Sequence, residues 1–69
     1  MIMEPSEIFE LIIKADEKLK YSTEKNAALR RGQAVELLEQ ARDAAREVGN
    51  EQLVQQAETR LADLGAEGP

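Results

Sequence analysis

Apolar side chains recur at helical spacing in three stretches of this chain, and the alternation typical of a half-buried β-strand is nearly absent. In the first stretch, one face is formed by Ile8, Ile12, Ala15 and Leu19. Their i, i+4, i+7, i+11 spacing is that of an amphipathic helix. Because Pro5 suits the first turn of a helix, we expect a helix over about residues 6–20.

Two further helices are expected over about residues 27–48 and 51–64. The apolar stripe of the second helix consists of Ala34, Leu37, Leu38, Ala41, Ala44, Ala45 and Val48. The stripe of the third helix consists of Leu53, Ala57, Leu61 and Leu64. Between these helices, Gly49 suits the left-handed conformation that ends a helix, and Asn50 suits the N-cap of the next one. Gly65 is expected to end the third helix in the same way.

Residues 21–26 are polar and rich in side chains that compete for backbone hydrogen bonds, so we interpret them as a connection. The alternative is a single long first helix that continues to about Arg31 and turns at Gly32. Short connections make successive helices antiparallel neighbours. The predicted fold is therefore all-α: an antiparallel up-down-up three-helix bundle, forming one domain over residues 1–69 with a short disordered tail at residues 66–69.

The composition of these 69 residues excludes several kinds of chemistry. Histidine and cysteine are both absent, which removes the usual general base, the thiol nucleophile, disulfides and two common transition-metal ligands. The four glycines are spaced as helix breakers and caps and form no phosphate-binding loop. We therefore expect a protein that is not an enzyme and that uses no cofactor and no metal.

Charge and hydropathy narrow the expected partners and location. The net charge of −5 opposes phosphate binding, so nucleic acid is not an expected partner. No apolar run exceeds the three residues of Leu11-Ile12-Ile13, which is far too short to span a membrane, so no membrane association is expected. No positive charge precedes an apolar run at the N-terminus, unlike in a secretory signal. Together with the absence of cysteine, this favours a cytoplasmic location.

A family resemblance is carried by the second and third predicted helices. Ala34-x3-Leu38-x2-Ala41 has small, large and small residues at the spacing found in the second helix of a tetratricopeptide repeat. Leu61-Ala62-Asp63-Leu64-Gly65 resembles the leucine–glycine stretch in the first helix of a following repeat. The resemblance covers residues 34–65, and the aromatic positions and closing proline of the repeat are not matched. It implies a helical hairpin in which small residues let one helix nest against the next.

The apolar arc of the first helix spans roughly half of its circumference, more than the ~100° that faces a single core. It is formed by Leu11, Ala15, Ile8, Leu19, Ile12, Phe9 and Ile13. One interpretation is that two other helices pack on this arc. The other is that Phe9 and Ile13 stay exposed, with Ile2 nearby and Asp16 on the margin, and contact another chain. The candidate partner-binding residues are therefore Ile2, Phe9, Ile13 and Asp16.

Charged side chains suggest structural contacts rather than catalysis. In an antiparallel hairpin Asp16 approaches the start of the second helix, so we predict a partly buried ion pair between Asp16 and Arg30. Elsewhere, acids and bases alternate along solvated helix faces, where each pair contributes only tenths of a kcal/mol, roughly 0.2–0.5. The expected surface pairs are Glu10–Lys14, Asp16–Lys20 and Asp43–Arg46.

A small basic cluster is formed by Lys25, Arg30 and Arg31, beside an asparagine. Three charges in an acidic protein make a limited patch, which could touch an acidic partner. Tyr21, the only tyrosine, is expected to cover the end of the bundle rather than to stack on a base or ligand.

These observations lead to one main hypothesis on function and three others. The main hypothesis is a non-catalytic helical protein–protein interaction module, a small adaptor or assembly subunit that docks a partner through an apolar helix face. The nearest alternative is a structural protein that associates with itself through the same face. An acidic mimic of nucleic acid comes third, because its acids would have to be massed and here they are mixed with bases along the chain. An enzyme comes last.

Overall fold

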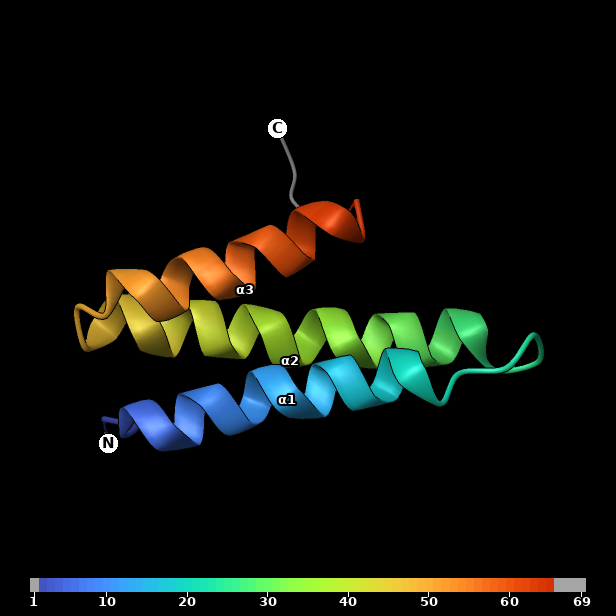
Figure 1. Ribbon diagram of the computed structural model, residues 1–69, viewed down its shortest axis with the longest axis horizontal. Helices are drawn as coiled ribbons and strands as arrows, with labels where there is room; N and C mark the ends of the chain where they lie inside the picture. Colours follow the sequence, from blue (N-terminus) through green and yellow to red (C-terminus); the bar gives the residue numbers. More distant parts are fainter. Residues whose placement is uncertain (1, 66–69) are drawn as a thin grey trace.

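The computed structural model describes residues 2–65, which form three α-helices and no β-strand. Helix α1 spans Pro5–Lys20, α2 spans Ala27–Glu47 and α3 spans Glu51–Asp63. The chain reverses at each connection, so α2 runs antiparallel to both of its neighbours (Figure 1). The predicted all-α up-down-up three-helix bundle is confirmed, with helix ends within one residue of those expected. The predicted disordered tail at residues 66–69 lies outside the described residues.

Residues 21–26 connect α1 to α2 through a turn that a side chain stabilises. The Asn26 side-chain oxygen accepts a hydrogen bond from the Thr23 backbone N–H at 2.6 Å. A side chain here takes the place of a backbone partner for this N–H, as the polar composition of the segment predicts. The alternative of one long helix reaching about Arg31 is therefore wrong, and Gly32 lies inside α2 instead of at a turn.

The turn between α2 and α3 uses the two residues that the sequence indicates. Gly49 has a φ of +72°, the left-handed conformation that glycine adopts without steric cost. Its N–H donates to the Arg46 carbonyl at 3.1 Å, and the Asn50 N–H donates to the Ala45 carbonyl at 2.9 Å. This is the Schellman arrangement of a helix end. The Asn50 side chain then accepts from the Leu53 N–H at 3.1 Å and caps α3.

The core consists of one apolar face from each helix, with α2 in the middle. Figure 1 shows α1 along one side of α2 and α3 along the other. Helices α1 and α3 contact each other much less than each contacts α2. The buried residues are Ile8, Ile12, Ala15, Ala34, Leu38, Ala41, Ala45, Leu53, Ala57 and Leu61. All of them belong to the predicted stripes. Five of these ten are alanines, so the helices pack closely around a core with few large side chains.

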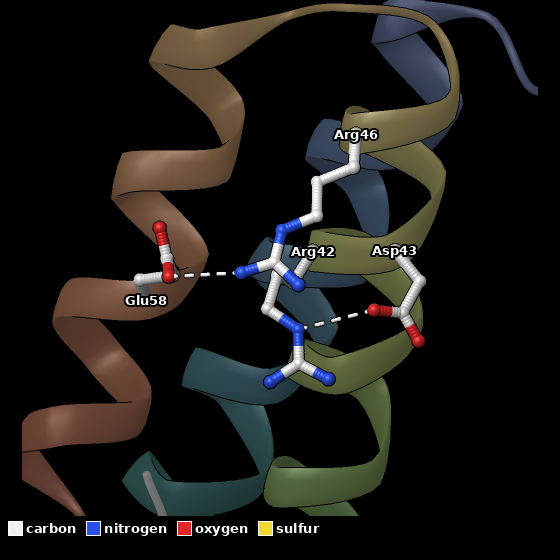
Figure 2. Close-up of polar contacts among 4 residues, drawn as sticks. All are labelled: Arg42, Asp43, Arg46 and Glu58. Atoms are coloured by element: carbon white, nitrogen blue, oxygen red, sulfur yellow. Dashed lines mark hydrogen bonds and ion pairs between the residues drawn. The ribbon is translucent and has the colours of Figure 1, made fainter. Parts of the chain in front are cut away.

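Salt bridges across and along the helices differ from the predicted surface pairs. Arg46 of α2 contacts Glu58 of α3 at 3.1 Å, whereas Arg42 contacts the adjacent Asp43 at 3.1 Å (Figure 2). Arg46 therefore reaches across to α3 instead of pairing with Asp43 along its own helix. The described residues contain none of the three predicted pairs, Glu10–Lys14, Asp16–Lys20 and Asp43–Arg46. Asp43 and Arg46 do not pair because Arg46 binds Glu58 and Asp43 binds Arg42.

Replacing Gly32 with alanine is expected to stabilise the fold. Gly32 lies in the interior of α2, and a Cβ added there meets no atom within 4 Å. Alanine should therefore raise the free energy of unfolding by about 1 kcal/mol, because it loses less backbone entropy on folding than glycine. For a domain of this size, the midpoint of thermal unfolding followed by circular dichroism should rise by roughly 4–8 °C.

Gly49→Ala is the matched control for this prediction, because it makes the same chemical change at a left-handed residue. The φ of +72° disfavours any side chain there, so this variant should lose about 1–2 kcal/mol. A Gly32→Ala protein that melts at or below the temperature of the parent would contradict the prediction.

Candidate protein-interaction site

Two of the candidate partner-binding residues lie side by side on one flank of α1. Phe9 and Ile13 are one helical turn apart, and 43% and 40% of their surfaces are exposed. Ile8 and Ile12 lie next to them in the sequence and are completely buried. The apolar arc of α1 is therefore buried at its centre and open at this margin. Ile2, which precedes α1, is 66% exposed.

Asp16 lies on the same flank, where it binds Arg60 of α3. The Arg60 Nε donates to both carboxylate oxygens, at 2.9 Å to Oδ1 and 3.2 Å to Oδ2. A second guanidinium nitrogen donates to the Gln56 carbonyl at 3.3 Å, which holds the Arg60 side chain along its own helix. The predicted Asp16–Arg30 pair is therefore wrong. The prediction considered only the hairpin of the first two helices. Asp16 instead lies on the flank of α1 that α3 approaches, so Arg60 binds it.

We define the interaction edge as Ile2, Phe9, Ile13 and Asp16, the residues that the sequence singled out. The structure brings Phe9, Ile13 and Asp16 onto one flank of α1 and fixes Asp16 in a salt bridge. Partly exposed apolar side chains beside a half-exposed charged pair have the composition of a protein-interface core next to its rim. Such an arrangement provides apolar packing surface beside a charged pair whose two members bind each other.

A second surface, which the sequence analysis missed, lies between α1 and α2. A depression of about 310 Å³ is lined by Lys14, Glu17, Lys18, Tyr21, Arg30 and Leu37. A smaller one of about 210 Å³ shares Lys18 and Leu37 and adds Gln33, Glu36 and Gln40. We call the residues of these two depressions the basic groove. The available signal was the i, i+4, i+7 spacing of Lys14, Lys18 and Tyr21, which places them on one face of α1.

Two sequence interpretations change at this surface. Tyr21 does not cover the end of the bundle: 62% of it is exposed, and its ring has the Lys20 Nζ 5.5 Å from its centroid. The two arginines of the predicted basic cluster also contact different parts of the structure. Arg31 donates to the carbonyl of Leu64, the residue that follows α3, whereas Arg30 lines the basic groove with residues of α1.

The part of the chain that the structure describes contains no group of three or more acidic side chains arranged to hold a metal ion. Among its helices, none combines the length and the apolar character needed to cross a bilayer. Acidic residues that share a helix face, such as Glu36 and Glu39, are thus not joined by a third ligand.

Comparison with known proteins yields no relative: no protein-family model, curated protein or solved structure matches this chain. The resemblance of residues 34–65 to the tetratricopeptide repeat therefore stays a prediction.

A double-mutant cycle on Asp16 and Arg60 should measure a positive coupling energy between α1 and α3. Because both side chains are partly exposed, we expect about 0.5–1 kcal/mol in the free energy of unfolding, falling as salt is added. The cycle compares Asp16→Asn, Arg60→Gln and the double variant by urea denaturation. A parallel cycle on Asp16 and Arg30 should give no coupling. Equal coupling in the two cycles would contradict the observed pairing.

Proposed function

We propose that this protein is a non-catalytic helical interaction module that docks a partner protein through the interaction edge of α1. The observation that supports this most directly is the exposure of Phe9 and Ile13, two large apolar side chains one turn apart beside the buried core. Leaving such side chains in water forgoes roughly 25 cal/mol for each Å² of apolar surface that a partner would cover. A partner helix packed against α1 would recover this free energy.

The charged margin of the interaction edge gives the proposed contact its orientation. Asp16 and Arg60 satisfy each other, so a partner can pack beside them without leaving either charge buried and unpaired. Charges at the rim of an interface mainly tune specificity and association rate, while apolar anchors supply affinity. The tetratricopeptide-like spacing of α2 and α3 supports the same class of function, because it is typical of helical hairpins that stack on other helices.

Self-association through the same edge is the second candidate function. It is favoured by the small size of the core, in which half of the buried residues are alanines. A second copy packed on Phe9 and Ile13 would add buried apolar area that a single chain of this size lacks. Light scattering at two concentrations separates the candidates, because self-association raises the mass above 7.7 kDa as the concentration rises.

Replacing Phe9 with aspartate should abolish association and leave the monomer folded. A charge at the centre of an apolar contact must be desolvated for binding, so we expect the dissociation constant to rise at least about thirtyfold, or 2 kcal/mol. In the free protein the side chain is 43% exposed, and the helix content by circular dichroism should stay unchanged. The measurement is recovery of the partner by immobilised protein, or the mass in solution if the protein associates with itself.

Leu29→Asp provides the matched control, because Leu29 is also apolar, is 64% exposed and lies in the first turn of α2. The same change of charge at this position should leave association intact. If Phe9→Asp and Leu29→Asp bind equally well, the interaction edge is not the docking surface.

A further inference from the structure

The basic groove gathers cations that form no salt bridge within residues 2–65. In residues 2–65, the three salt bridges use arginines outside the groove: Arg42, Arg46 and Arg60. Lys14, Lys18 and Arg30 line the larger depression together and form no salt bridge with the described residues. Glu17 and Glu36 line the same depressions, but neither forms a salt bridge with these three cations.

The fold concentrates this positive charge at one end of the molecule. Residues 14–31 contain six of the nine basic residues and only three acidic ones, in a chain whose net charge is −5. The end of α1 and the beginning of α2 lie at the same end of the bundle, on the right in Figure 1. The opposite end holds the start of α1, with Glu4 and Glu7, and the turn into α3, with Glu51. The longest dimension of about 37 Å therefore separates a basic end from an acidic one.

Helix stability does not account for the cation that α2 contributes. A cation near a helix N-terminus opposes the macrodipole, which favours acids there. Helices α1 and α3 follow this rule with Glu7 and Glu51, whereas the first turn of α2 contains no acid and is followed by Arg30. The Arg30 side chain forms no hydrogen bond with the described residues. The Arg30 guanidinium is therefore available to an anionic group from outside the described residues.

The remaining side chains of the groove indicate what kind of anion fits. Leu37 is half-buried, and with the ring of Tyr21 it offers apolar surface between the cations. Glu17 and Glu36 line the same depressions, so a polymer with a negative charge on every unit would meet repulsion there and from the acidic remainder of the protein. A short peptide with few carboxylates around one apolar side chain matches both features.

We propose that the basic groove binds an acidic peptide segment of a partner protein. One large apolar side chain of the segment packs against Leu37 and Tyr21, and its flanking carboxylates contact Lys14, Lys18 and Arg30. The groove lies between α1 and α2, whereas the interaction edge lies on the flank of α1 that faces α3. The two surfaces are therefore separate, and this inference does not rest on the function proposed for the interaction edge.

The experiment measures the fluorescence anisotropy of a labelled peptide with a central leucine flanked on both sides by glutamates. We expect saturable binding that weakens as salt is raised. Lys18 lines both depressions, so Lys18→Gln should weaken binding by about fivefold. Lys25→Gln removes the same charge from the connection, outside the groove, and should change binding by about twofold or less. A peptide with lysines in place of the glutamates should not bind.

Other outcomes would overturn the proposal. The absence of binding to the glutamate peptide, or equal weakening by Lys18→Gln and Lys25→Gln, would remove the groove as its site. Tighter binding of a single-stranded oligonucleotide than of the peptide would assign the groove to nucleic acid. If no peptide binds, but the protein associates with itself at low salt and Lys18→Gln abolishes this association, the groove binds the acidic end of a second copy. Peptide binding by Phe9→Asp should equal that of the parent, which keeps this test independent of the interaction edge.

Discussion

The packing of α2 against both of its neighbours depends on small side chains at the helix contacts. Helix α2 has three completely buried alanines, Ala34, Ala41 and Ala45, and α3 has one, Ala57. Alanine allows helix axes to approach to the short end of the usual 8–10 Å range. Close approach leaves little volume for large side chains, so the apolar area of the core is limited. The stability of the fold therefore rests on a few residues such as Leu38 and on well-formed helix ends.

The same constraint explains why α1 presents two different surfaces. A central strip of α1, with Ile8 and Ile12, is sufficient to fill the narrow space against α2. Apolar side chains beside this strip have no space in the core and remain partly in water, as Phe9 and Ile13 do. On the other flank, Lys14 and Lys18 face the start of α2 across a shallow depression. A thin core thus leaves much of the helix surface available for contacts with other molecules.

Local signals made the fold predictable, whereas the partners of charged side chains depend on tertiary structure. The turn at Gly49 and Asn50 could be predicted because one residue must adopt a positive φ and the next must cap a helix. The partner of Asp16 could not, because the antiparallel hairpin suggested Arg30, whereas the contact with Arg60 depends on where α3 lies along α1. The basic groove was missed for a similar reason: its lysines and Arg30 are far apart in sequence and meet only when α1 and α2 pack.

The short contact between α1 and α3 has a consequence for how the molecule opens. Helix α3 has only thirteen residues and packs mainly on α2, with fewer contacts to α1 that include the Asp16–Arg60 salt bridge. A helix of this length is only marginally stable in water by itself, so its detachment from α2 entails its unfolding. We expect α3 to exchange its amide hydrogens through a local opening that leaves the α1–α2 hairpin in place. The helix pair that carries the basic groove would then persist while the last helix is transiently unfolded.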